Sequence, residues 1–124
     1  MTSIVILEDV NKLLCGGKMM KLWIDDIREP PFGYVWCKSV NDAKQRIIDN
    51  EQANRVNHFK YPISLLDIDH DAGNYAFDGG DYIRLLDWLE ETGRSYPIRI
   101  HSANPVGVAN MRRIIRRNGW IEVF

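Results

Sequence analysis

Short apolar runs alternate with amphipathic segments along most of this chain. The runs at residues 22–24, 34–37, 63–68 and 98–100 have the length and composition of buried strands. With a last apolar run at residues 121–124, the pattern predicts the order β-β-α-β-α-β-α-β. Strands that alternate with helices indicate an α/β fold with a mostly parallel sheet. The helices are predicted from apolar side chains three and four residues apart, which are Val40, Ala43 and Ile47, then Tyr82, Leu85, Leu86 and Leu89, then Val108, Met111 and Ile115.

Two of the predicted helices have clear start signals. Ser39 is a good N-cap, and Asp42 follows three residues later in an arrangement close to a capping box. Asn104 is also a good N-cap, with Pro105 at the first helical position. Both helices therefore begin directly after a predicted strand.

The first 19 residues are harder to assign. Residues 4–7 read as a strand, and residues 10–14 contain apolar side chains at helical spacing. Met19 and Met20 directly precede the first clear strand. Translation starting at one of these methionines is therefore an open alternative. We therefore divide the chain into an N-terminal extension at residues 1–19 and one domain at residues 20–124.

Three polar clusters each follow a predicted strand. They occupy residues 25–28, 67–71 and 101–105. The carboxyl ends of parallel strands lie along one edge of a sheet, and ligands bind in the crevice there. We therefore expect acidic side chains, two histidines and a helix start to converge although they are far apart in the sequence.

The acidic side chains of these clusters offer only oxygen ligands. Oxygen-only sites favour Mg²⁺, Ca²⁺ or Mn²⁺ over zinc. Adjacent carboxylates repel each other unless a cation neutralises them, so we expect Asp25 and Asp26 to hold a divalent metal together with Asp69. Either Asp71 or His70 would complete the shell or orient a water molecule. Asp78 and Asp81, by contrast, are expected only to cap helices and turns, which is the competing interpretation for the whole set.

The third cluster has the residues for phosphate chemistry. A histidine at the end of a strand, beside a helix start, can protonate a leaving oxygen, and His101 has this position. Ser102 and the N–H groups after Asn104 would bind phosphate oxygens, and Arg28 beside the acidic pair is a further phosphate ligand. The alternative for His101 and for His70 is a histidine of the core that is satisfied by hydrogen bonds.

Two other patterns are weaker. The spacing of Asp67, Asp69 and Asp71 resembles the opening of an EF-hand loop, but Gly73 falls one position late and a strand led by Pro62 replaces the incoming helix. Asp67 itself fits a structural acceptor inside the strand end. The four arginines at residues 112–117 fit a solvated helix face, with a groove for an RNA backbone as the sharper alternative.

Composition narrows the class of protein. At 124 residues with 45% hydrophobic content and a net charge of -1, the chain fits one compact domain with no global attraction to nucleic acid or membrane. Cys15 and Cys37 are expected to be reduced thiols of a cytoplasmic protein. No apolar stretch approaches the roughly 20 residues that span a bilayer.

The clusters resemble the receiver domains of two-component signalling. These have an acidic pair after the first strand, an aspartate after the third, and a Ser-Ala pair after the fourth. Here they are Asp25 and Asp26, either Asp67 or Asp69, and Ser102 and Ala103. Receivers also need a lysine after a fifth strand, and none is found there. The helix between the first two strands is replaced by a short loop with two prolines, and two histidines are added.

With these departures, the motifs at residues 22–30, 69–73 and 101–111 are similar to those of cyclic-phosphate processing receiver domains. That resemblance implies a receiver-like (flavodoxin-like) fold with a five-stranded sheet flanked by helices. It also implies a role in processing cyclic phosphate ends of RNA, as in RNA repair, or cyclic nucleotides. The leading hypothesis is a metal-dependent phosphoesterase that uses Mg²⁺ or Mn²⁺. The alternatives are a non-catalytic module that binds a phosphorylated ligand or a protein, and an ordinary phospho-accepting receiver, which the missing lysine disfavours.

Overall fold

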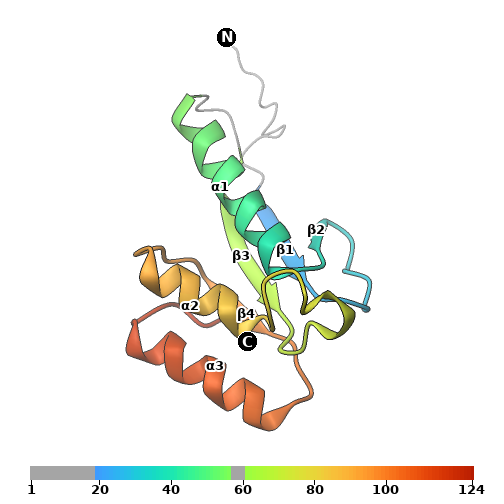
Figure 1. The fold of residues 1–124 in the computed structure, drawn as a ribbon. Helices are drawn as coiled ribbons and strands as arrows, with labels where there is room; N and C mark the ends of the chain where they lie inside the picture. The colour runs from blue at the N-terminus through green and yellow to red at the C-terminus, as the bar shows by residue number, and fades with distance from the viewer. Residues whose placement is uncertain (1–18, 57–60) are drawn as a thin grey trace.

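Four parallel strands form the sheet of this domain, in the order β2-β1-β3-β4 (Figure 1). The computed structural model describes residues 19–56 and 61–124. The extension predicted at residues 1–19 therefore lies almost wholly outside the described residues. The elements are β1 (Met20–Ile24), β2 (Tyr34–Cys37), α1 (Val40–Val56), β3 (Ile63–Ile68), the short 3₁₀ helix η1 (Gly73–Tyr75), α2 (Ile83–Glu91), β4 (Ile98–Ile100) and α3 (Pro105–Arg117).

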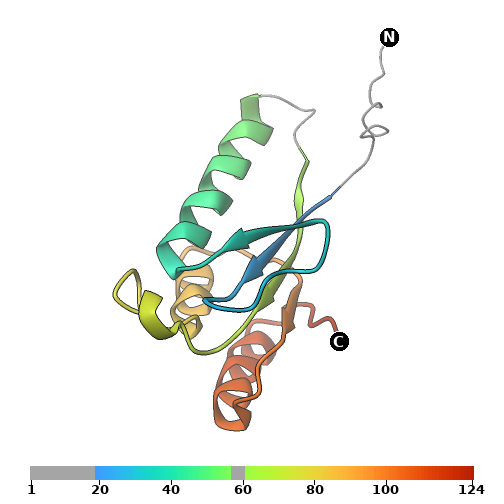
Figure 2. The ribbon, with the colours of Figure 1, turned by 90° about the vertical axis from the view of Figure 1, so that its right-hand side faces the viewer.

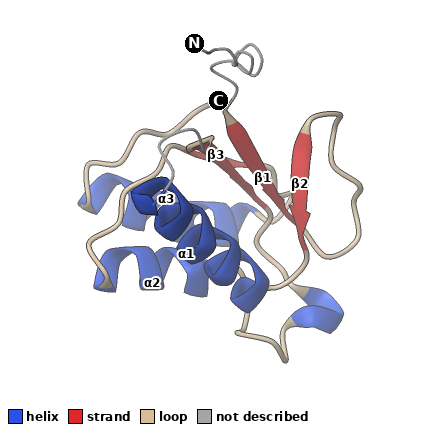
Figure 3. Ribbon diagram, turned by 90° about the horizontal axis from the view of Figure 1, so that it is seen from above, coloured by secondary structure: helices blue, strands red, loops and turns tan. Residues whose placement is uncertain are grey.

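The three α-helices lie on one face of the sheet (Figure 3). Alternate strand residues such as Leu22, Leu66 and Ile98 point to this face and are fully buried. The predicted helix starts are confirmed, because Ser39 Oγ accepts a hydrogen bond from the N–H of Asp42 and Asn104 caps α3. The helix side of the core consists mainly of Val40, Ala43, Ile47, Tyr82, Leu85, Leu86, Leu89, Met111 and Ile115.

The other face of the sheet carries no helix of the described chain. A loop at residues 25–33 joins β1 directly to β2, as the sequence predicts. Two indole groups on this face bind the loop: Trp23 Nε1 donates to the carbonyl of Arg28, and Trp36 Nε1 donates to the carbonyl of Asp25, each at 2.8 Å. The start of the loop at residues 25–33 is therefore held by side chains of the sheet face beneath it.

The predicted last strand at residues 121–124 is wrong, so the sheet has four strands and not five. Only one parallel bridge forms there, between Glu122 and Ile98. The side chain of Glu122 bonds to Arg112 Nε at 2.7 Å, and the guanidinium of Arg112 lies 5.3 Å from the ring of Phe124. These contacts hold the segment against α3, so it does not continue along β4.

No helix in the described residues is both long and apolar enough to cross a membrane.

Candidate metal and phosphate site

The loops that follow β1, β3 and β4 meet at one edge of the sheet (Figure 2). Backbone hydrogen bonds continue the parallel pairing just beyond the strand ends. The N–H of Asp69 donates to the carbonyl of Ile24 at 2.9 Å, and the N–H of His101 donates to the carbonyl of Ile68 at 2.9 Å. The polar residues of all three clusters are thereby brought together, as the sequence analysis expected.

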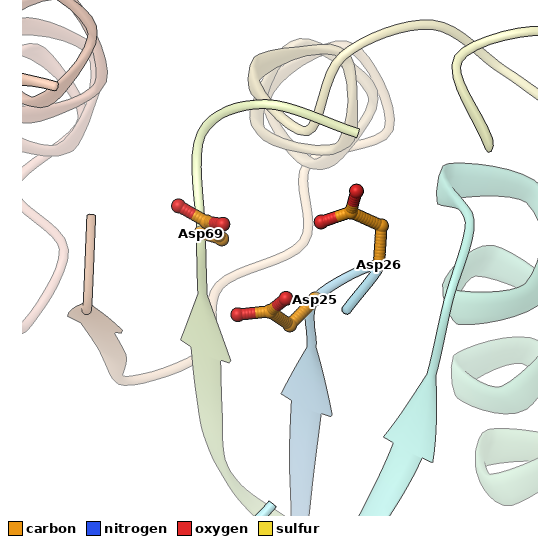
Figure 4. Close-up of side chains that lie close together, drawn as sticks. All are labelled: Asp25, Asp26 and Asp69. Atoms are coloured by element: carbon orange, nitrogen blue, oxygen red, sulfur yellow. The ribbon is translucent and has the colours of Figure 1, made fainter. Parts of the chain in front are cut away.

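Three carboxylates face one another at this edge (Figure 4). Asp25, Asp26 and Asp69 each offer one oxygen within 4.8 Å of the others. Asp25 is 1% exposed and Asp69 is 9% exposed, so water screens their charges poorly. A set of oxygen donors from two loops fits the coordination preferences of Mg²⁺ or Mn²⁺.

The two adjacent carboxyl groups have different environments. Burial would by itself raise the pKa of Asp25, but its carboxylate accepts hydrogen bonds from the N–H groups of Arg28 and Ile27 and contacts His101. These contacts hold the pKa of Asp25 below its ordinary value. The pKa of Asp26 is raised, first by burial and then by the negative charges of Asp25 and Asp69. The repulsion that the sequence predicted thus falls mainly on Asp26.

A glycine makes room for that carboxylate. Gly73 has a φ of +53°, and a Cβ on it would lie 2.3 Å from Oδ2 of Asp26. Both the backbone conformation and the lack of a side chain are therefore required at this position. From the sequence, Gly73 was considered only in the comparison with an EF-hand loop and as part of the motif at residues 69–73, so its contact with the acidic group was not predicted.

His101 is clamped between two buried carboxylates. Its Nδ1 lies 2.7 Å from Oδ1 of Asp67, and its Nε2 lies 2.9 Å from Oδ2 of Asp25. The ring stacks on Trp23 with centroids 3.8 Å apart, and the side chain is only 7% exposed. The expectation that this histidine faces an open cleft is therefore not met, although the residue does contact the acidic group.

Asp67 lies beside the site and not in it. It is fully buried, and besides His101 it contacts the hydroxyl of Tyr34 and the guanidinium of Arg99, both at 3.1 Å. This confirms its interpretation as a structural acceptor at the strand end. Tyr34, Arg99 and Trp23 were not recognised from the sequence; the signal was strand alternation, since all three share a sheet face with Asp67.

His70 has a more open environment. Its Nδ1 lies 2.7 Å from Oδ1 of Asp71, and its side chain is 16% exposed. The ring packs against Gly107 in the first turn of α3, where a Cβ would lie 2.4 Å from the imidazole carbons. Among the described residues, no group hydrogen-bonds to Nε2 of His70. Of the two histidines, it is the one that keeps a ring nitrogen available.

We expect Gly107→Ala to show opposite effects in two backgrounds. In the wild-type chain the new methyl group collides with His70 and should lower the free energy of unfolding. In a His70→Ala background the collision is gone, so the better helix propensity of alanine should raise that energy by about 0.5–1 kcal/mol. Urea unfolding of the four proteins measures this. Equal effects in both backgrounds would show that His70 does not pack on α3.

The predicted phosphate ligands gather at the start of α3. The guanidinium of Arg28 donates to the carbonyl of His101 at 3.2 Å, and Ser102 Oγ accepts from the N–H of Asn104 at 3.1 Å. However, Asn104 Oδ1 already accepts from the N–H of Gly107 at 3.0 Å, and Pro105 has no N–H. This helix start therefore offers fewer free amides to a phosphate than the sequence suggested.

Of the two aspartates expected only to cap helices and turns, Asp81 bonds a backbone N–H at the start of η1, whereas Asp78 bonds two side chains at the start of α1. Asp78 accepts hydrogen bonds from Ser39 Oγ at 2.6 Å and from Asn41 Nδ2 at 3.1 Å. Asp81 accepts from the N–H of Ala72 at 3.0 Å. These contacts tie the loop after β3 to the starts of α1 and η1, and so they support the position of Gly73 against the acidic group.

Comparisons with known proteins place this arrangement in a family. The model of the cyclic-phosphate processing receiver domain matches residues 20–117. Among solved structures, the chain is similar to the response regulator LqsR of Legionella pneumophila, with 16% identity and a TM-score of 0.42, over 85% of this chain and 37% of that protein. Comparison with curated proteins gave no match. Because the family model covers every strand and all three site loops, the chain belongs to the cyclic-phosphate processing receiver domains.

Proposed function

We propose that this domain is a metal-dependent phosphoesterase that opens cyclic phosphates, either at RNA ends or in cyclic nucleotides. The observation that carries the proposal is the convergence of Asp25, Asp26 and Asp69, with oxygens within 4.8 Å of one another, beside the start of α3. A bound Mg²⁺ or Mn²⁺ would neutralise phosphoryl charge and lower the pKa of a water molecule. The pKa of Asp26 is raised by burial and then by the negative charges of Asp25 and Asp69, and a bound cation would offset those like charges.

The surrounding side chains have separate roles in this proposal. Arg28 and Ser102 bind phosphate oxygens where Asn104 begins α3. His70, oriented by Asp71, exchanges a proton with the leaving oxygen or with water through its available Nε2. This assignment follows from the contact of 2.7 Å between His70 Nδ1 and Asp71 Oδ1.

His101 was the first candidate for the general acid, and its contacts favour a different role. Both of its ring nitrogens are engaged by carboxylates. It is better suited to hold Asp25 in the orientation that a metal needs, in the manner of outer residues that orient metal ligands. A transfer of its proton to substrate would require one of these contacts to open.

The contacts of His101 with Asp67 and Asp25 also support a second candidate function. If neither histidine transfers a proton, the site can bind a phosphorylated ligand without reacting. A non-catalytic receiver-like module would use the acidic group, Arg28 and Ser102 in the same positions. The two functions differ in turnover and not in the identity of the ligand.

Turnover of 2′,3′-cyclic AMP separates them. With added Mg²⁺ or Mn²⁺, we expect the protein to form a nucleoside monophosphate, which chromatography detects, and we expect EDTA to stop the reaction. The His70→Ala protein is the matched control for a contaminating enzyme, since a contaminant would be unaffected by the substitution. Metal-dependent binding of the nucleotide without product would favour the binding module. Absence of both would contradict the proposal.

A further inference from the structure

One face of α3 carries a basic surface groove that the proposed function does not use. The groove has a volume of about 390 Å³ and is lined by Ala109, Arg112, Arg113 and Arg116. These positions have the spacing i, i+3, i+4 and i+7, so they form one stripe along the helix. Ala109 lines the end of the groove nearer the start of α3. We call this stripe the α3 groove.

The charges of the α3 groove are only partly balanced. Arg112 is paired with Glu122 at 2.7 Å, and the neighbouring Arg117, outside the groove, is paired with Glu90 at 2.9 Å. Among the residues that the structure describes, Arg113 bonds to the side-chain amide oxygen of Asn110, at 2.8 Å, and to no carboxylate. Within the described part of the chain, neither Arg113 nor Arg116 has a carboxylate partner. With a net charge of -1 for the whole chain, this positive stripe is a local feature.

We propose that the α3 groove binds the phosphodiester backbone of a single-stranded RNA. Arginine side chains present several N–H donors in a plane that matches the oxygens of a phosphate. A row of them without acidic partners attracts a chain of regularly spaced negative charges more than it attracts a single ion. Arg113 and Arg116 are the principal contacts, because their charges are not already neutralised.

The groove begins near the end of α3 that adjoins the acidic site. Gly107 packs on His70 from the buried side of α3, and the groove lies on the opposite, exposed side, where Arg113 and Arg116 lie about 9 Å and about 14 Å further along the helix axis. An RNA strand whose end lies at the acidic site therefore reaches the groove by passing around the start of α3. This choice of RNA rests on the proposed function, because a 2′,3′-cyclic phosphate requires a 2′-hydroxyl group. The groove then distinguishes an RNA end from a free cyclic nucleotide as the preferred ligand.

The test measures RNA binding without turnover. The probe is a 5′-fluorescein-labelled 12-nucleotide RNA with a 2′,3′-cyclic phosphate end, and the readout is fluorescence anisotropy across a salt series. We expect Arg113→Glu/Arg116→Glu to weaken binding at least tenfold. The slope of log affinity against log salt should fall by about 1.4, since each phosphate contact to a single strand contributes about 0.7. Circular dichroism verifies that the variant is folded, and the milder Arg113→Gln/Arg116→Gln is used if it is not.

The matched control is Arg55→Glu/Arg84→Glu, which makes the same charge change at two exposed arginines on α1 and α2. Equal loss in control and variant, or no loss in either, would overturn the proposal. So would an acidic peptide that binds the α3 groove when the RNA does not. If RNA binding depends on Arg113 and Arg116 but no cyclic phosphate is opened, the groove stands and the proposed activity fails. If the cyclic nucleotide is turned over but RNA binding does not depend on Arg113 and Arg116, the proposed activity stands and the proposal for the groove fails.

Discussion

Replacing His101 by alanine is expected to lower the free energy of unfolding by about 3 kcal/mol. The substitution leaves two carboxylates, Asp25 and Asp67, facing a cavity, and they are 1% and 0% exposed. Breaking a buried pair costs about 3–5 kcal/mol. The lower value is expected here because Asp25 keeps two backbone N–H partners and Asp67 keeps Tyr34 and Arg99. Urea unfolding measures the change.

His101→Phe separates the contribution of ring stacking to stability from the contribution of the two contacts between ring nitrogens and carboxylates. Phenylalanine retains the stacking on Trp23 but removes both nitrogen contacts, so most of the loss should remain. A free general acid would behave differently: the alanine variant would fold normally, and kcat would fall by about 10²–10⁴-fold. Unchanged stability in both variants would therefore contradict the structural role given to His101 here.

Asp26→Asn is expected to stabilise the metal-free protein and to abolish its response to metal. A carboxyl group whose pKa is raised in the folded state contributes stability below its unfolded-state pKa, and this is lost as the pH rises through the raised pKa. At neutral pH the ionised Asp26 therefore destabilises the fold, and asparagine removes that effect. With Mn²⁺ the order should reverse, because a ligand selective for the native state stabilises it.

Turnover should depend on the same carboxylate. If the metal supplies several kcal/mol of charge stabilisation, Asp26→Asn should lower kcat/KM at least about 100-fold. Calorimetric titration measures the affinity for Mn²⁺, and melting curves with and without Mn²⁺ measure the stabilisation that the metal gives. Asp49→Asn is the matched control, because it removes the charge of an exposed carboxyl on α1 that only accepts a hydrogen bond from Gln45. Equal metal affinity in wild type and Asp26→Asn would remove Asp26 from the site. Asp26 is a cleaner probe than Asp25, whose carboxylate also holds the loop.

The residues at the sheet edge were predictable because the end of a strand is recognised from a few neighbouring residues in the sequence. An apolar run followed by aspartate or histidine places those residues at the edge whatever the details of packing, so the sequence predicted that Asp25, Asp26 and Asp69 lie at the same edge of a parallel sheet. Orientation could not be read in this way. Whether His101 points into a cleft or between two carboxylates depends on Trp23 and Asp67, which come from two other strands.

The errors have a related cause. The segment at residues 121–124 is apolar enough to be a strand, but one ion pair between Glu122 and Arg112 holds it against α3 after a single bridge. The helix start at Asn104 was recognised correctly, yet its own side chain takes an amide that a phosphate was expected to use. Hydrogen bonds of individual side chains decided both outcomes, and the pattern of apolar positions carries no information about them.

The hydrogen bonds that fix the loop after β1 also give the molecule an internal optical reporter. Trp36 donates to the carbonyl of Asp25, and Trp23 stacks on the ring that contacts the carboxylate of the same residue. Any ligand that moves or neutralises Asp25 changes the electric field at both indoles, and the emission of an indole depends on that field. Occupancy of the acidic group is thus coupled to intrinsic fluorescence without an added label, through two tryptophans on the sheet face that no helix of the described chain covers.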